Sequence, residues 1–223
     1  MNFLVYLGII ILLPLYAQFK VKSTYNKYSK VRSTSGMTGA QVARLILDHN
    51  GLQDVKVVET QGVLSDHYNP VTKIVALSSQ NYHEASVAGT AVAAHEVGHA
   101  IQDKEAYAFL RFRHRLAPVA GITSNASWFF IMAGLIFSSM NSLLGIGIIM
   151  MAVGVVFQVV TLPVEFNASS RAMTQIVELG IIRNEEEPHA KKVLSAAAMT
   201  YVAATAVAVL ELLRLVTIFL NRD

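Results

Sequence analysis

The chain has 223 residues, of which 53% are hydrophobic and only 15% are charged, whereas soluble domains carry about 25% charged residues. Its mean hydropathy of +0.45 indicates a membrane protein. The absence of cysteine excludes disulfides, thiolate metal sites and a cysteine nucleophile. The net charge of +3 comes from Lys and Arg residues that flank apolar segments. A nucleic-acid-binding protein would gather them on one soluble face, so we expect the lipid bilayer as a partner and no nucleic acid.

The first segment, residues 1–19, is predicted to be an N-terminal transmembrane anchor. Phe3 to Phe19, FLVYLGIIILLPLYAQF, is uncharged and lies at the short end of the roughly 17–25 residues that a membrane helix needs. A cleaved signal peptide is the alternative. No Lys or Arg precedes the apolar run and no A-x-A site follows it, so a retained anchor is favoured.

Residues 20–116 are predicted to form an α+β catalytic part. Thr38 is a plausible N-cap, and Asn50-Gly51 a plausible stop, for a helix between them. Alternating hydrophobicity over residues 55–60 (VKVVET) predicts a strand.

A second stretch of this part, residues 63–78 (VLSDHYNPVTKIVALS), predicts two short strands around a turn at His67–Pro70. Its last strand, residues 73–78, is either an edge strand that could pair with an extended substrate or an ordinary core strand.

A metal-binding motif follows on a predicted helix over residues 86–102. The stretch AVAAHEVGHAIQ places His95 and His99 one turn apart on one helix face. Two imidazoles in this arrangement can hold a zinc ion, and the adjacent Glu96 can take a proton from a metal-bound water. Burying these polar groups on a helix of Ala, Val and Gly is costly unless they are paired or bind a metal. A paired structural cluster is the alternative to a zinc site.

The second half of the chain is predicted to begin with a transmembrane hairpin, residues 117–162. Two apolar runs, Ala117–Met140 and Leu143–Leu162, are each long enough to span a bilayer. Only Asn141 and Ser142 separate them, so a tight antiparallel turn is expected.

The remaining residues are predicted to be a cytoplasmic helix, 163–192, and a C-terminal transmembrane helix, 193–223. In the first, the acidic run at 185–187 is expected to be a solvated helix start. In the second, Glu211 and Arg214 are three residues apart and are expected to form a salt bridge.

The distribution of basic residues predicts the orientation. Residues 20–115 carry 12 Lys and Arg residues and residues 163–195 carry 4, whereas the predicted hairpin turn has none. Basic loops stay in the cytoplasm, so we expect an integral protein of a bacterial-type plasma membrane with its active site facing the cytoplasm and both termini outside. The alternative is that the last apolar run lies along the interface.

The third zinc ligand is predicted to be Glu165, in LPVEFNASSRA. Catalytic zinc sites use three protein ligands, and a tight hairpin returns the chain to its point of entry. Glu165 should therefore lie beside His95 and His99. The alternative is a carboxylate favoured by a helix N-terminus. Asn167 and Ser169 are expected to hydrogen-bond the ligands.

These motifs carry a family resemblance over nearly the whole chain. AAHEVGHAIQ and LPVEFNAS, together with LSDHYNP and TYVAATAVAVLELLRL, resemble the YugP family of neutral zinc metallopeptidases. The general plan is similar to HtpX and the CAAX prenyl proteases. HtpX-like enzymes carry an aspartate four residues after the ligand glutamate, where this chain has Ser169.

The resemblance implies one Zn²⁺ per chain, held by His95, His99 and Glu165, with Glu96 as the general base. Together with the apolar runs, it predicts a mainly α membrane protein: about four transmembrane helices plus a small α+β zincin-like (gluzincin) cytoplasmic part.

The predicted function is that of a zinc-dependent integral membrane endopeptidase acting on protein or peptide substrates at the cytoplasmic membrane surface. The transition state needs an oxyanion donor, and Arg171 is preferred over four other candidates: His67, Tyr68, His83 and His114. One alternative is a non-catalytic zinc-stabilised membrane scaffold or binding module, and another is hydrolysis of a non-peptide amide or ester. The oligomeric state and the cleavage specificity do not follow from the sequence.

Overall fold

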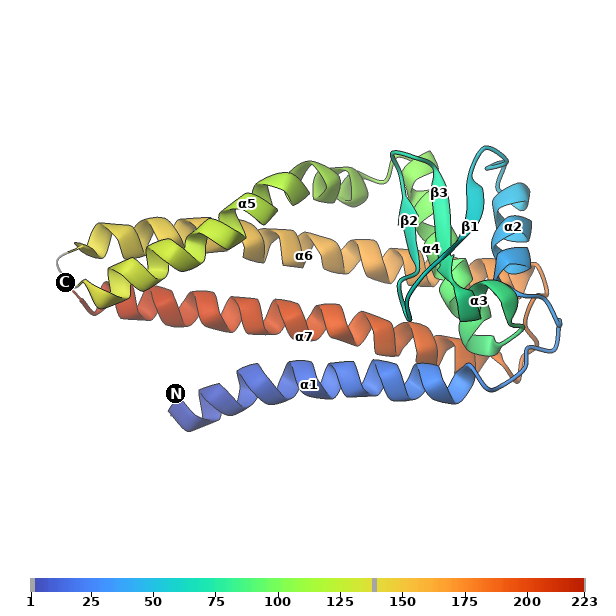
Figure 1. Ribbon diagram of the computed structural model, residues 1–223, viewed down its shortest axis with the longest axis horizontal. Helices are drawn as coiled ribbons and strands as arrows, with labels where there is room; N and C mark the ends of the chain where they lie inside the picture. Colours follow the sequence, from blue (N-terminus) through green and yellow to red (C-terminus); the bar gives the residue numbers. More distant parts are fainter. Residues whose placement is uncertain (1–2, 138–139, 223) are drawn as a thin grey trace. The chain divides into compact units, whose positions relative to one another are not determined.

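The computed structural model describes residues 3–137 and 140–222 (Figure 1). The helices are α1 (Phe3–Tyr28), α2 (Gly39–His49), α3 (Ser79–His83), α4 (Val87–Lys104), α5 (Ala108–Ile136), α6 (Asn141–Glu178) and α7 (Glu187–Leu220), and the strands are β1 (Lys56–Thr60), β2 (His67–Asn69) and β3 (Ile74–Ser78). Residues 1–2, 138–139 and 223, which belong to the predicted anchor, hairpin and C-terminal helix, lie outside the described residues.

The chain divides into two compact units, and three helices take part in both. The helical unit contains residues up to 15, 108–163 and from 201 onward; the α+β unit contains residues 16–107 and 164–200. Helices α1, α6 and α7 therefore each have one part in either unit.

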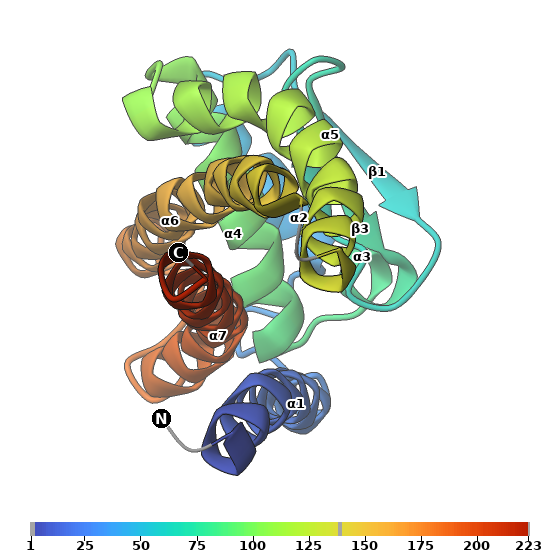
Figure 2. The same ribbon diagram turned by 90° about the vertical axis from the view of Figure 1, so that its left-hand side faces the viewer.

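The helical unit is built from apolar helices. Within the described residues, four helices, α1, α5, α6 and α7, are long and apolar enough to cross a membrane, which agrees with the predicted number. Figure 2 looks along the axes of α6 and α7. Helices α5 and α6 approach closely because Gly134 has no side chain: a Cβ there would lie 2.4 Å from the backbone nitrogen of Leu144. Such small-residue contacts are typical of membrane helix pairs.

The helix bounds differ from the predicted ones. Helix α1 continues past the predicted end of the anchor to Tyr28, and α6 continues without a break through Pro163 to Glu178. The polar helix expected after residue 162 is therefore the second half of α6. Asn141 and Ser142, expected to be the hairpin turn, are the first residues of α6. Composition marks where an apolar run ends, whereas the backbone hydrogen bonds of a helix can continue into polar sequence.

The first helix of the α+β unit begins and ends as predicted. The Thr38 side chain accepts a hydrogen bond from the backbone N–H of Gln41, and the Gln41 side chain bonds back to the Thr38 N–H. This capping box satisfies two donors that the helix start leaves free. At the other end Asn50 caps α2 and Gly51 adopts a φ of +66°, a value that favours glycine.

The sheet has three strands in the order β1-β3-β2, with β1 parallel and β2 antiparallel to β3. Strand β3 is therefore the central strand, so of the two alternatives for residues 73–78 the core strand is correct and the edge strand is not. Val75 to Ser78 are all buried, and a buried strand needs hydrogen-bond partners on both sides.

The turn between β2 and β3 also lies later than predicted. His67 to Asn69 form strand β2 rather than the start of the turn. The Asn69 side-chain oxygen accepts hydrogen bonds from the backbone N–H groups of Val71 and Thr72. This local side-chain bonding is a common turn device of asparagine, and it starts the turn after Asn69.

Helix α4 forms the centre of the α+β unit. It packs against α2, α3 and the sheet, and almost all of its residues from Val87 to Gln102 are buried. Its small side chains let neighbouring backbones come close. Other elements also contribute to the core, for example Ile46 of α2, Leu77 of β3 and Ile176 of α6.

Two predicted charge arrangements do not hold in full, although Glu185 and Glu187 are exposed and Glu187 begins α7 as expected. Glu186, expected to be solvated, is 6% exposed and accepts hydrogen bonds from the backbone N–H groups of Thr34 and Arg183. Among the described residues, Arg214 does not pair with Glu211. Its guanidinium lies 4.3 Å from the ring centroid of Tyr6, where the negative face of the ring attracts a cation.

Candidate metal centre

The two histidines of the motif lie on the same face of α4, as predicted. Ser86 caps the helix by accepting a hydrogen bond from the Gly89 N–H at 3.0 Å. The imidazole rings of His95 and His99 then stand edge to face, with their centroids 4.8 Å apart. Both side chains are mostly buried, at 15% and 11% exposed.

Gly98, between the histidines, allows α6 to approach α4. A Cβ at this position would lie 2.6 Å from the carbonyl oxygen of Ala168, which is closer than real Cβ atoms come to backbone. Only glycine therefore permits this helix contact. Because Glu165 lies one turn before Ala168 on α6, the contact brings its carboxylate to the histidines.

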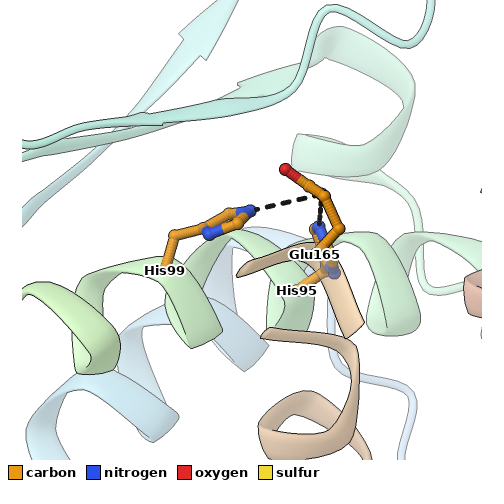
Figure 3. A group of neighbouring side chains, drawn as sticks. All are labelled: His95, His99 and Glu165. Carbon is orange, nitrogen blue, oxygen red and sulfur yellow. Dashed lines mark hydrogen bonds and ion pairs between the residues drawn. The ribbon is translucent and has the colours of Figure 1, made fainter. Parts of the chain in front are cut away.

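The three side chains converge on one point (Figure 3). Glu165 Oε2 lies 3.3 Å from His95 Nε2 and 3.7 Å from His99 Nε2, and the three potential ligand atoms all lie within 4.8 Å of one another. Tetrahedral zinc with ligands at about 2.0–2.2 Å requires ligand separations of about 3.3–3.6 Å. The Glu165–His95 separation falls in this range and the Glu165–His99 separation lies close to it, so two imidazole nitrogens and one carboxylate oxygen placed in this way are suited to zinc.

The hydrogen bonds around Gln102 fix the tautomer of His99. Gln102 Nε2 donates to the carbonyl oxygen of Val164 at 2.8 Å, and a carbonyl can only accept, so the amide orientation is defined. Gln102 Oε1 therefore faces His99 Nδ1, 3.0 Å away. His99 Nδ1 must carry the proton, which leaves the lone pair of a neutral ring on Nε2, directed toward Glu165.

The same network continues along α6. Asn167 Oδ1 accepts from Gln102 Nε2 at 2.9 Å and from Arg171 Nε at 2.7 Å. Arg171 also pairs with Glu105, with 2.6 Å between Nη2 and Oε2. Asn167 thus supports His99 through Gln102 rather than directly.

Ser169 contacts the other histidine. Its Oγ lies 3.2 Å from His95 Nδ1. A hydroxyl at this position can accept a hydrogen bond from the Nδ1–H and so direct Nε2 toward Glu165, which is what a carboxylate would do in the same place.

Glu96 is buried beside the cluster, at 8% exposed, and is not one of the three converging residues. Burial raises the pKa of the Glu96 carboxyl above its usual value, although the neighbouring His95 and His99 lower it. Burial opposes protonation of His99, but the Glu165 carboxylate and Glu96 outweigh it and raise the pKa of the imidazole. A carboxyl whose pKa is raised in this way is suited to accept and return a proton.

The remaining predicted oxyanion donors have other contacts. The Tyr68 hydroxyl donates to Asp103 Oδ2 at 2.8 Å. His67 Nδ1 lies 2.8 Å from the Ser65 carbonyl oxygen, and His83 Nε2 lies 3.1 Å from Glu59 Oε2. His114 is on α5, in the helical unit.

Gln102 is a site residue that the sequence reasoning missed. Its side chain is fully buried, and it follows His99 by three residues on α4. A buried amide at this spacing, on a helix of otherwise small residues, is the signal that could have identified it.

These features define a class: a membrane protein whose α4 and α6 helices carry a candidate His-His-Glu metal centre. The chain belongs to the family described as "Putative neutral zinc metallopeptidase", which matches residues 3–220. The curated relative "Putative membrane protease YugP" of Bacillus subtilis (strain 168) is 53% identical over 209 residues, covering 94% of this chain and 92% of the relative. No solved structure matches the chain significantly.

Proposed function

We propose that this protein is a zinc-dependent membrane endopeptidase that hydrolyses peptide bonds of protein substrates. The observation that carries the proposal is the convergence of His95 Nε2, His99 Nε2 and Glu165 Oε2 beside the buried Glu96. The family description and the name of the relative support it. A purely structural metal site has no need of an unliganded carboxylate next to the metal.

In the proposed reaction, Glu96 handles the proton. Zinc bound by the three ligands would lower the pKa of water and polarise the scissile carbonyl. Glu96 takes a proton from the attacking water while the oxygen of that water forms a bond to the carbonyl carbon. Glu96 then gives that proton to the amine nitrogen as the C–N bond breaks.

The surrounding residues hold this machinery in place. Gln102 and Ser169 orient the two histidines so that Nε2 of each is free to bind metal. Arg171 is our preferred oxyanion donor. It also donates a hydrogen bond to Asn167, which in turn accepts one from Gln102, so Arg171 helps to hold Gln102 in place. We further propose that the α+β unit is zincin-like.

We also propose where the reaction occurs. Basic residues in the α+β unit indicate that it faces the cytoplasm, because loops rich in Lys and Arg remain on that side. The protein would then be integral to a bacterial-type plasma membrane and cleave at its cytoplasmic surface. The proposal includes the predicted segments: an anchor, a catalytic part, a hairpin, a ligand helix and a C-terminal span.

The first test is the metal content of detergent-purified protein, because it requires no substrate. We expect about one zinc per chain, as for a three-ligand site, and its loss in Glu165→Ala. The matched control is Glu178→Ala, which removes an exposed carboxylate from the same helix and should keep the zinc. Zinc retained in Glu165→Ala would place the third ligand elsewhere.

The second test separates an enzyme from a scaffold. Glu96→Gln should retain zinc but lower peptide hydrolysis by about 10²–10⁴-fold, the usual contribution of a general base. Zinc binding with no cleavage in either protein, across a library of unfolded and membrane protein substrates, would favour the non-catalytic scaffold.

A further inference from the structure

A groove of about 750 Å³ lies in the α+β unit, between the second half of α1 and the first turns of α7. Tyr28 of α1 packs against His189 of α7 at one end, with ring centroids 4.8 Å apart. The lining residues are Lys20, Ser23, Thr24, Lys27, Tyr28, Pro188, Lys191, Lys192, Ser195, Ala196 and Met199.

The polar side chains of this groove are cationic or neutral. Its four charged lining residues are all lysines, two from each helix, and no carboxylate lines it. Within residues 3–137 and 140–222, no ion pair involves any of these four lysines. The hydroxyls of Thr24 and Ser195 add hydrogen-bonding groups, whereas the Ser23 hydroxyl donates to the Lys20 carbonyl oxygen at 3.2 Å. Such a set of ammonium and hydroxyl groups is complementary to an anion with several oxygens, such as a phosphate.

The groove lies where the apolar runs of α1 and α7 give way to polar sequence. On α1, Lys20 directly follows the apolar run that ends at Phe19, and on α7, Lys191 and Lys192 directly precede the apolar run that begins at Val193. Along α7 the lining changes from lysines to Ala196 and Met199, and Met199 is 36% exposed. A ligand complementary to this lining is anionic at one end and apolar at the other.

We propose that this groove binds the headgroup of an anionic phospholipid, with the phosphate at the lysines and the acyl chains along Met199 toward the apolar parts of α1 and α7. Basic pockets between membrane helices recognise anionic lipid headgroups through the same chemistry. The site is separate from the metal centre, and it does not depend on the proposed peptidase activity.

The test is native mass spectrometry of the full chain with added phosphatidylglycerol, and with phosphatidylcholine as a zwitterionic comparison. The groove variant combines Lys27→Gln, Lys191→Gln and Lys192→Gln. The matched control combines Lys22→Gln, Lys30→Gln and Lys56→Gln, which removes the same charge from exposed lysines outside the groove. The thermal unfolding midpoint in detergent, measured for each protein, reports whether the chain is folded.

We expect wild type and control to retain phosphatidylglycerol in preference to phosphatidylcholine, and the groove variant to retain at least about tenfold less of it. A variant with arginine at the same three positions should bind as wild type does. Equal losses in groove variant and control would overturn the proposal, as would equal retention of phosphatidylcholine. Displacement of the lipid by inorganic phosphate at millimolar concentration would show that a free anion, not a phospholipid, is the ligand.

Discussion

Gln102 holds His99 in the orientation that a metal ligand requires. Gln102→Ala leaves His99 Nδ1 and the buried Val164 carbonyl without their partner. We expect zinc affinity to fall by about 10–100-fold, as is usual when an outer hydrogen bond of a ligand is removed. Competition with a chelator of known affinity measures the change. The control is Gln61→Ala, on an exposed loop, and an equal loss there would contradict the assignment.

Gly98 is the second residue on which the site depends. Gly98→Ala places a methyl group 2.6 Å from the Ala168 carbonyl oxygen, so α4 and α6 must separate. We expect a lower thermal unfolding midpoint together with weaker zinc binding, because the displaced helix carries Glu165. In Gly121→Ala, by contrast, the new methyl group meets nothing within 4 Å, and both measurements should stay close to wild type. Normal zinc binding in Gly98→Ala would show that the helix contact does not position the ligand.

At the scale of elements, Glu186 connects the start of α7 to the loop that follows α1. Burial opposes its ionisation, but hydrogen bonds from Arg183 and Thr34 outweigh burial and hold the pKa of the Glu186 carboxyl below its usual value. The carboxylate therefore stabilises the fold above the pKa of an unfolded glutamate, about 4.3. This contribution is lost as the pH falls through the lower folded value.

The corresponding prediction concerns Glu186→Gln. At pH 7 we expect the variant to lose about 1–3 kcal/mol of unfolding free energy, the usual value of hydrogen bonds to a charged group. The difference from wild type should shrink below about pH 4. Unfolding in detergent at several pH values measures it. Glu185→Gln changes an exposed neighbour and should have little effect. If the stability difference between wild type and Glu186→Gln grew as the pH fell, the Glu186 carboxylate would not be the stabilising form.

Sequence patterns predicted some elements well and others poorly. The α2 helix follows from Thr38 and Asn50-Gly51, because capping and left-handed backbone are properties of single residues and their near neighbours. The place of β3 in the middle of the sheet did not follow, because strand order depends on pairing between segments distant in the chain. The burial of Glu186 was missed for the same reason, since its partner Thr34 is 152 positions away.

At the scale of the whole molecule, the proposed orientation can be tested in intact cells. The chain has no cysteine, so a single introduced cysteine is labelled without background. Met140→Cys, an exposed position directly before α6, should react with a membrane-impermeant maleimide in intact cells. Gln61→Cys, in the α+β unit, should react only after permeabilisation. The reverse pattern would place the candidate metal centre outside the cytoplasm.

The sequence by itself determined that this is a helical membrane protein with a His-Glu-x-x-His helix, because hydrophobic length and helical spacing are local properties. It also predicted Glu165 as the third ligand, since a hairpin constrains where the chain returns. The tertiary structure alone revealed Gln102, and it showed that Asn167 contacts Gln102 while Ser169 contacts His95. It also revealed the close α4–α6 contact that Gly98 permits. These features depend on distances between side chains on separate helices, and only the packing of those helices sets such distances.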